Sequence, residues 1–202
     1  MISPTDVTGV ILAGGRGRRM GGQDKGWLML DGRPLVEHAL LRLAPQVGGL
    51  VVSANRHLER YRGLGVPIVT DPLPDYPGPL AGALGAMRLV ATPWMLLAPV
   101  DMPWLPLETC ERLARARDEA DIAVAHDGER LQPLVALIRT SLRDDLAAWL
   151  ADGGGKVVHW YARHRWCEID FSDLGPRFAN LNTPQDHVRA ESGARGGKGD
   201  ES

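Results

Sequence analysis

The residues with the clearest chemical potential lie in one loop, residues 12–25, with the sequence LAGGRGRRMGGQDK. Five of the nine residues from position 14 to position 22 are glycine, so the backbone can approach a ligand closely. Successive backbone N–H groups in such a loop form a concavity that binds anions. The loop carries one acid, Asp24, against four cations: Arg16, Arg18, Arg19 and Lys25. This combination predicts a phosphate-binding loop, and a triphosphate is the ligand that matches its charge.

Two familiar phosphate-binding motifs do not fit this loop. A dinucleotide-binding GxGxxG motif that begins at Gly15 fails at Met20. A Walker A motif that begins at Gly17 reaches Gly22 and then meets Gln23 where the motif requires lysine. The alternative is a flexible surface loop with solvated arginines. The concentration of cations among glycines favours phosphate binding over that alternative.

Two aspartates each follow a short apolar segment that has the pattern of a strand. Asp101 follows residues 94–100 (WMLLAPV), and Asp71 follows residues 66–70 (VPIVT). Doubly wound sheets bind their ligands at the carboxyl ends of strands, and Mg²⁺ takes one or two carboxylates together with phosphate oxygens and water. Asp101 therefore fits the role of a Mg²⁺ ligand. Both aspartates lie just before a proline, so a role in a turn is the competing interpretation.

The loop, written LAGGxGRRMGGxDKG, resembles the signature of the molybdenum cofactor guanylyltransferases, the MobA family, within the wider nucleotidyltransferase fold. The resemblance continues in order over most of the chain, from position 9 to about position 188. It rests on further segments at 54–56 (ANR), 75–82 (DYPGPLAG), 101–103 (DMP), 126–130 (HDGER) and 180–184 (NLNTP).

This resemblance implies an activity and a set of site residues. The activity is transfer of GMP from GTP to the phosphate of molybdenum-molybdopterin, with Mg²⁺ as cofactor, which gives the guanine dinucleotide form of the molybdenum cofactor and pyrophosphate. Catalysis falls to Lys25, Asp101 and Arg19, with Asp101 as the metal ligand. The implied GTP contacts are Leu12, Ala13, Gly14, Gly15, Lys25, Ser53, Asp71 and Asp101. The implied contacts with the second substrate, molybdopterin, are Arg19, Gly78, Gly82, Lys156, Asn180 and Asn182.

Several of these residues also have an ordinary structural explanation. Gly78 and Gly82 flank a predicted helix start, where the backbone can bind an anion or where glycine allows close helix packing. Asn180 and Asn182 precede a capped helix, where asparagine commonly shapes a turn. The sequence also departs from the family at one position: Ser53 stands where the family usually has asparagine. A serine offers fewer hydrogen bonds to a base or ribose than an amide does.

The sequence shows neither a Ser/His/Asp set nor a catalytic cysteine, so it does not suggest a covalent enzyme intermediate. Direct in-line attack by an already ionised phosphate on the α-phosphorus needs positioning and charge neutralisation. Lys25, the glycine-rich loop and Mg²⁺ on Asp101 can supply both. Three other functions stay open: a cytidylyltransferase acting on molybdopterin or another phosphate, a sugar-phosphate nucleotidyltransferase, and a non-catalytic GTP-binding carrier of molybdopterin.

Strand and helix patterns alternate along the chain. This alternation predicts a three-layer α/β fold, with a mostly parallel sheet and helices on both faces, of the Rossmann-like nucleotidyltransferase kind. Pro67 favours an edge position for its strand or a position at the start of the strand. Strands are expected at residues 7–13, 50–54, 66–70, 94–100, 121–125 and 134–138. Helices are expected at residues 34–46, 78–90, 106–117, 141–150 and 183–189.

The 202 residues fit one domain, residues 1–190, followed by a disordered tail at 191–202 that has no large apolar side chain. A net charge of −2 gives no basic surplus for binding nucleic acid. No segment has the pattern of a signal peptide or a membrane span, and two widely spaced cysteines suit a reducing cytosol. We therefore expect a cytoplasmic protein, with a monomer favoured, that binds GTP and molybdopterin and binds neither nucleic acid nor membrane. The resemblance adds molybdenum-insertion proteins and molybdoenzyme chaperones as candidate protein partners.

Overall fold

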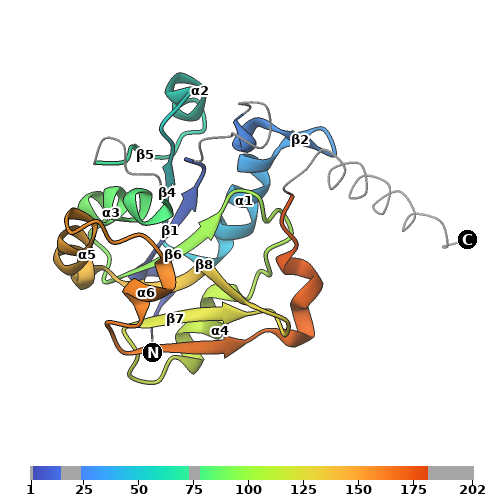
Figure 1. The fold of residues 1–202 in the computed structure, drawn as a ribbon. Coiled ribbons are helices and arrows are strands. Elements are labelled where there is room, and N and C mark those ends of the chain that lie inside the picture. Colours follow the sequence, from blue (N-terminus) through green and yellow to red (C-terminus); the bar gives the residue numbers. More distant parts are fainter. Residues whose placement is uncertain (1, 15–23, 73–77, 182–202) are drawn as a thin grey trace, which may run out of the picture.

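Seven strands form one central sheet in the order β5-β4-β1-β6-β8-β7-β9 (Figure 1). The structure is a computed structural model, and it describes residues 2–14, 24–72 and 78–181. The strands are β1 (Val7–Leu12), β4 (Gly49–Ser53), β5 (Ile68–Val69), β6 (Trp94–Pro99), β7 (Ile122–His126), β8 (Leu131–Arg139) and β9 (Trp166–Asp170). The helices are α1 (Leu35–Leu43), α2 (Leu58–Arg62), α3 (Pro79–Leu89), α4 (Thr109–Ala116), α5 (Arg143–Ala151) and α6 (Val157–Tyr161).

The sheet is mostly parallel, as the sequence predicts. Strands β5, β4, β1 and β6 run in one direction. Strand β8 runs antiparallel to both of its neighbours, β6 and β7, and β9 is parallel to β7. The short strand β5 lies at an edge of the sheet, which confirms the position expected from its proline.

Two hydrophobic clusters, one on each face of the sheet, produce three layers (Figure 1). One cluster packs α3, α5 and α6 on the sheet, through residues such as Leu84 and Leu146. The other packs α1 and α4 on the opposite face, and includes Leu35. Successive side chains of a strand point to opposite faces, so in β1 Val10 joins one cluster and Ile11 joins the other. The prediction of helices on both faces is confirmed.

Some element boundaries differ from those predicted. The helix expected at 34–46 is divided in two. Its α-helical part is α1, and a 3-10 turn, η4 (Ala44–Gln46), follows because Pro45 cannot donate an α-helical hydrogen bond. The strand expected at 134–138 is the longer β8, which contains Pro133. Its pairing with β7 shifts register in that part of the strand, where a proline is tolerated. The helix expected at 183–189 lies outside the described residues.

The sequence analysis did not predict several short elements. These are α2, α6, β9 and a hairpin of β2 (Met29–Leu30) and β3 (Arg33–Pro34). The hairpin turns at Asp31 and Gly32, which both have positive φ, so this Asp-Gly pair was a usable turn signal. Strand β9 gives a weak signal because Ile169 is its one buried residue.

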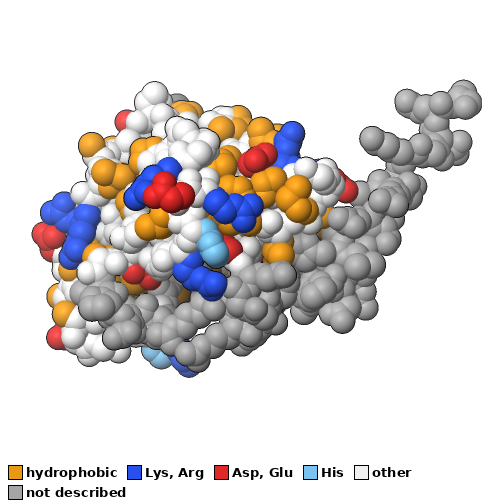
Figure 2. Space-filling model, turned by 90° about the horizontal axis from the view of Figure 1, so that it is seen from above, with side chains coloured by type: hydrophobic (Ala, Val, Ile, Leu, Met, Phe, Trp, Pro, Cys, Tyr) orange, Lys and Arg blue, Asp and Glu red, His pale blue; other side chains and the backbone are white. Residues whose placement is uncertain are grey.

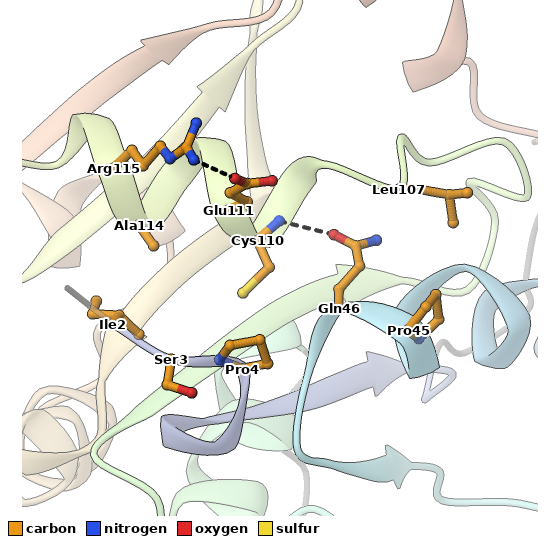
Figure 3. A pocket seen from close by; sticks show the side chains of 10 residues that line it. All are labelled: Ile2, Ser3, Pro4, Pro45, Gln46, Leu107, Cys110, Glu111, Ala114 and Arg115. Carbon is orange, nitrogen blue, oxygen red and sulfur yellow. Dashed lines mark hydrogen bonds and ion pairs between the residues drawn. The ribbon is translucent and has the colours of Figure 1, made fainter.

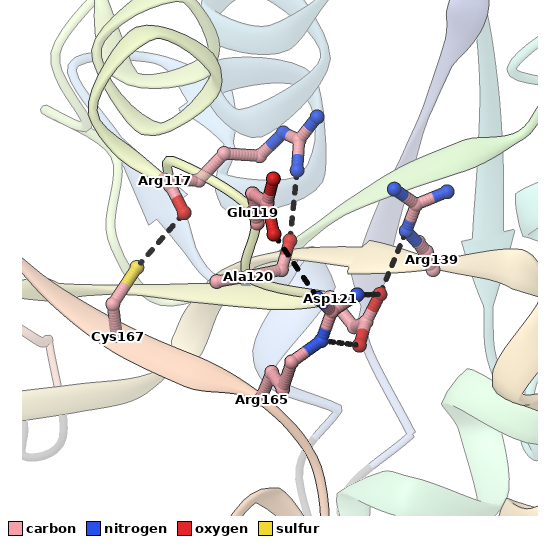
Figure 4. Close-up of polar contacts among 7 residues, drawn as sticks. All are labelled: Arg117, Glu119, Ala120, Asp121, Arg139, Arg165 and Cys167. Carbon is pink, nitrogen blue, oxygen red and sulfur yellow. Dashed lines mark hydrogen bonds and ion pairs between the residues drawn. The ribbon is translucent and has the colours of Figure 1, made fainter.

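The amino ends of the parallel strands are closed by packing and ion pairs. Asp121, just before β7, forms an ion pair with Arg139 Nε at 2.9 Å and accepts a hydrogen bond from Arg165 Nε at 3.2 Å, which ties β7, β8 and β9 together (Figure 4). A cavity of about 300 Å³ lies at the same edge, where Pro4 precedes β1 and Pro45 precedes β4 (Figure 3). This edge is the opposite one from the predicted site.

The carboxyl ends of four neighbouring strands finish level with one another. Leu12, the last residue of β1, pairs with Ser53 in β4 and with Pro99 in β6. Ser53 in turn pairs with Val69, the last residue of β5. The loops after these strands therefore begin side by side, at the edge where parallel α/β sheets bind their ligands.

Candidate active site

Lys25 and Asp101 meet at this carboxyl edge. Lys25 Nζ donates to Asp101 Oδ2 at 2.9 Å. One residue, Val100, separates Asp101 from the end of β6, and Lys25 begins the 3-10 turn η3 (Lys25–Trp27). Their side chains are 27% and 16% exposed, so both are accessible from solvent. The structure thus brings together two residues assigned to catalysis from the sequence.

The turn that carries Lys25 is fixed by its neighbours on either side. Asp24 caps η3, and its Oδ1 accepts a hydrogen bond from the backbone N–H of Gly26 at 3.1 Å. Gly26 is buried, and a Cβ at that position would lie 2.3 Å from the hydroxyl oxygen of Tyr61. The Asp-Lys-Gly sequence therefore has a structural reason: a capping acid precedes the lysine, and no side chain fits after it.

A second group of contacts joins the loops after β1, β4 and β5. Asn55 Oδ1 accepts from the backbone N–H of Asp71 at 2.8 Å. A Cβ on Gly14 would lie 3.0 Å from Asn55 Nδ2, so Gly14 packs closely on the same amide. Burial raises the pKa of Asp71, and a hydrogen bond with Asn55 offsets part of that rise. Gly14 and Asp71 are predicted GTP contacts, whereas the sequence analysis gave Asn55 no role beyond a family motif.

Ser53, another predicted GTP contact, is placed differently. Its side chain is 1% exposed and lies beneath α3, where a Cβ on Gly82 would be 2.4 Å from Ser53 Oγ. The hydroxyl therefore faces a helix and not the open edge. Gly82, a predicted contact with the second substrate, allows this close approach of α3 to β4, in agreement with its alternative interpretation as a packing residue. The Ser53 carbonyl oxygen accepts from Ala13 N at 2.8 Å and so holds the start of the loop that is predicted to bind phosphate.

Asn180 directly precedes Leu181, which contacts Asp101 at the end of the described chain. The backbone N–H of Leu181 donates to the carbonyl oxygen of Asp101 at 2.9 Å. Asn180 Oδ1 is buried and has no hydrogen-bond partner among the described residues. A buried acceptor without a partner is uncommon and costs free energy, so this amide is suited to a donor from a ligand.

The remaining predicted residues are more scattered. Gly78 is the N-cap residue of α3, and Lys156 is exposed at the N-cap of α6. Gly15, Arg19 and Asn182 lie outside the described residues. Of the site predicted from the sequence, the structure therefore joins Lys25 to Asp101, and the neighbour of Asn180, Leu181, contacts Asp101.

The residues that could hold a metal ion are few. In the described ranges, no three His, Cys, Asp or Glu side chains form a group that could bind an ion by themselves. Asp101 offers a carboxylate beside Lys25, which suits a hard cation that takes most of its ligands from phosphate and water. It does not suit a structural zinc site, which needs four protein ligands.

Figure 2 shows the surface on the side where α2 lies in Figure 1. Basic, acidic and apolar side chains are interspersed over the described part of this face. The described part of this face therefore carries charges of both signs, in agreement with the small net charge of −2.

Comparisons with known proteins agree with this geometry. Residues 9–165 match the family model described as a MobA-like NTP transferase domain. The chain is 49% identical over 190 residues to a molybdenum cofactor guanylyltransferase of Cupriavidus necator, which covers 91% of this chain and 95% of that protein. A protein of the same name from Bordetella petrii is 49% identical over 189 residues, covering 91% and 96% of the two chains.

A solved structure shows the same fold. Molybdopterin-guanine dinucleotide biosynthesis protein A from Archaeoglobus fulgidus superposes with a TM-score of 0.75 at 26% identity, over 94% of this chain and 99% of that one. This likeness confirms the Rossmann-like nucleotidyltransferase fold expected from the sequence. The chain belongs to the MobA-like NTP transferase family, among the molybdenum cofactor guanylyltransferases, and is a nucleotidyltransferase.

Proposed function

We propose that this chain transfers GMP from GTP to the phosphate of molybdenum-molybdopterin and releases pyrophosphate. One observation carries the proposal: a lysine and a carboxylate from distant parts of the chain meet, 2.9 Å apart, at the carboxyl edge of the parallel strands. In a family of nucleotidyltransferases, the lysine of such a pair can neutralise negative charge on the transferred phosphate, and the carboxylate can hold a cation that does the same. The curated relatives named above carry the name of this activity.

The nucleotide site is built from the level strand ends. Leu12, Ala13 and Gly14 lead into the phosphate loop, which continues through Gly15 to Lys25. Backbone N–H groups in a glycine-rich loop bind phosphate oxygens. Asp71 offers a carboxylate that can accept hydrogen bonds from a nucleoside. In this proposal Ser53 serves GTP binding through its backbone, because its hydroxyl is enclosed beneath α3.

A divalent cation accompanies the nucleotide in this proposal, and Mg²⁺ is the ion that we assign to Asp101. The accessible carboxylate of Asp101 fits Mg²⁺ because this ion takes few protein ligands and keeps phosphate oxygens and water. When bound, the ion neutralises negative charge on the triphosphate. Lys25 then provides a second positive charge that does not depend on the metal.

The reaction itself needs little covalent chemistry from the protein. A phosphate oxygen of molybdopterin attacks the α-phosphorus of GTP, the bond from that phosphorus to the bridging oxygen of the β-phosphate breaks, and pyrophosphate leaves with the electron pair. The attacking phosphate is already ionised at neutral pH, so no side chain must take a proton from it. Lys25, with Arg19 from the phosphate loop, stabilises the transition state, and the loop amides hold the α-phosphate in line.

The second substrate is held beside the α-phosphate. Two observations on Asn180 support this position. Its buried Oδ1 lacks a hydrogen-bond partner among the described residues, and the next residue in the chain, Leu181, contacts Asp101. A pterin offers N–H donors that such an acceptor can bind. The proposed contacts with the second substrate also include Arg19, Lys156 and Asn182. Gly78 takes part at the start of α3, and Gly82 takes part as a packing residue that lets α3 approach β4 closely.

The experiment uses GTP labelled in either the α- or the γ-phosphate, together with Mg²⁺ and molybdenum-molybdopterin. We expect the α label to move to the pterin product and the γ label to appear in pyrophosphate, with much less transfer from CTP. Tight GTP binding without pyrophosphate release would support the non-catalytic carrier instead. Faster transfer from CTP would support a cytidylyltransferase, and transfer to a sugar phosphate would support the remaining alternative.

The cellular setting is also part of the proposal. None of the helices in the described ranges is long and apolar enough to cross a bilayer. We propose a cytoplasmic monomer that receives molybdopterin from molybdenum-insertion proteins and passes its product to chaperones of molybdoenzymes. Size-exclusion chromatography with light scattering tests the monomer directly.

A further inference from the structure

The position of Lys25 depends on a contact with a residue from α2. Tyr61 OH donates to Asp24 Oδ1 at 2.6 Å, although the two residues are 37 positions apart. The same Oδ1 accepts the backbone N–H of Gly26, so Asp24 joins α2 to the turn η3. A short hydrogen bond to an ionised acceptor is stronger and more directional than one between neutral groups. Lys25 lies between Asp24, which carries this carboxylate, and Gly26, whose backbone N–H the carboxylate binds.

Tyr61 is held firmly enough to serve as an anchor. Its side chain is fully buried in the hydrophobic cluster that also contains Leu35 and Val36. The ring of Tyr61 contacts the ring of Trp27, with a centroid distance of 5.1 Å. The guanidinium of Arg60 in turn covers the Trp27 ring, 4.1 Å from its centroid. Burial, together with Asp24, raises the pKa of Tyr61, so the phenol remains a donor throughout the neutral range.

Gly26 provides the complementary observation. A Cβ on Gly26 would lie 2.3 Å from Tyr61 OH and 3.2 Å from Tyr61 Cζ. The hydroxyl therefore occupies the space that a side chain at position 26 would need, and the buried ring cannot move aside at low cost. The phenol contacts η3 both through the cap residue before Lys25 and through the glycine after it.

We propose that Tyr61 is a positioning residue for guanylyl transfer: through Asp24 it sets the 3-10 turn that holds Lys25 Nζ against Asp101. This inference rests on the proposed function for its effect on turnover, but its effect on Lys25 is measurable without any substrate. A displacement of about 1 Å in a catalytic group can cost on the order of 100-fold in rate, so a residue that never touches GTP can control the reaction.

The test is Tyr61→Phe, which retains the buried ring and removes the hydroxyl. Tyr161→Phe is the matched control, because Tyr161 is equally buried, donates to Pro133 O at 2.7 Å and belongs to the cluster on the opposite face of the sheet. The direct readout is the rate at which acetic anhydride labels Lys25, measured by mass spectrometry. The sequence contains three lysines, and the exposed Lys156 serves as the internal reference on the same molecule.

We expect Tyr61→Phe to raise the labelling rate of Lys25 relative to Lys156 by about threefold or more, and Tyr161→Phe to leave it unchanged. Turnover with GTP and molybdopterin should fall about tenfold in Tyr61→Phe with the KM for GTP changed less than about threefold, because the lost interaction acts on the transition state. Asp24→Ala should reproduce both changes, and it keeps the test decisive if Tyr61→Phe does not fold.

A double substitution adds a second readout. Gly26→Ala should lower turnover strongly in the wild-type background and much less in the Tyr61→Phe background, where the new methyl meets only ring carbons. Equal labelling of Lys25 in wild type, Tyr61→Phe and Asp24→Ala would overturn the inference. A wild-type protein that shows no guanylyl transfer would overturn the proposed function alone, because the labelling comparison would still stand.

Discussion

Lys25 and Asp101 are separated by 76 positions in the chain, yet Lys25 Nζ lies 2.9 Å from Asp101 Oδ2. Both side chains are partly exposed, and ion pairs of this kind contribute about 1 kcal/mol or less to folding. The pair therefore contributes little to the free energy of folding. Its importance is chemical, since it places a cation and a hard oxygen ligand where the ends of β1 and β6 adjoin.

The first prediction concerns Asp101→Asn. The amide can still accept from Lys25 Nζ, so the melting temperature should change by no more than about 2 °C, as is usual for a substitution that leaves no buried charge unpaired. Turnover should fall by about 100-fold or more, because the substitution removes the charged metal ligand. A Mg²⁺ titration of the rate checks this, with Asp145→Asn as the control for a carboxylate paired with Arg163 away from the site. Normal turnover at ordinary Mg²⁺ would remove Asp101 from the catalytic set.

The second prediction uses the raised pKa of Asp71. Because burial raises this pKa, the folded protein holds the proton more tightly than the unfolded chain does. Stability is therefore lost as the pH rises from the ordinary aspartate pKa of about 4 through the higher folded value, and the loss persists at neutral pH. Asp71→Asn removes this loss, so its melting temperature should exceed that of the wild type at pH 7.

At a pH well below 4, this advantage of Asp71→Asn should disappear, because the wild-type carboxyl is then protonated in both states. If Asp71 contacts GTP, the same variant should bind GTP about tenfold or more weakly, since a charged acceptor has been lost. Calorimetric melting curves at several pH values, together with GTP titrations, check both effects. An Asp71→Asn protein that is less stable at pH 7 than the wild type would contradict the prediction.

The third prediction separates packing from substrate binding at Gly82. A methyl group at this position would lie 2.4 Å from Ser53 Oγ, so Gly82→Ala should lower the free energy of unfolding by about 1–3 kcal/mol through overpacking. Adding Ser53→Gly should restore part of that stability, because it removes the obstructing hydroxymethyl group. Denaturant unfolding of both single variants and the double variant measures this coupling. Strict additivity of the two substitutions would argue against the contact.

The fourth prediction concerns Asn180. Its Oδ1 is buried without a partner in the described part of the chain, and such a group costs roughly 1–3 kcal/mol. Asn180→Ala should therefore keep or raise the melting temperature and leave the affinity for GTP unchanged. The KM for molybdopterin should rise about tenfold, which steady-state kinetics with varied pterin would show. Joint loss of stability and GTP binding would instead make Asn180 a structural turn residue.

The sequence by itself determined the class of fold and the main chemistry. Apolar segments such as residues 94–100 alternate with helical patterns, and this local periodicity is enough to predict a layered α/β protein. The glycine-rich loop and Asp101 were found because phosphate binding and metal binding need particular residue types that are visible in the chain. The order of the motifs led to the family, which the comparisons confirm.

Only the tertiary structure decided which of these residues meet. In β4, Val51 faces the α3 side of the sheet and Val52 the opposite side, so Ser53 again faces α3 and is covered by Gly82. The contact of Tyr61 with Asp24 likewise has no signature in the short segment that becomes α2. Periodicity is a local property, whereas these contacts depend on strand order, register and the side of the sheet on which each helix returns. Those quantities are set by packing the whole chain, and they turn a set of suitable residues into a site.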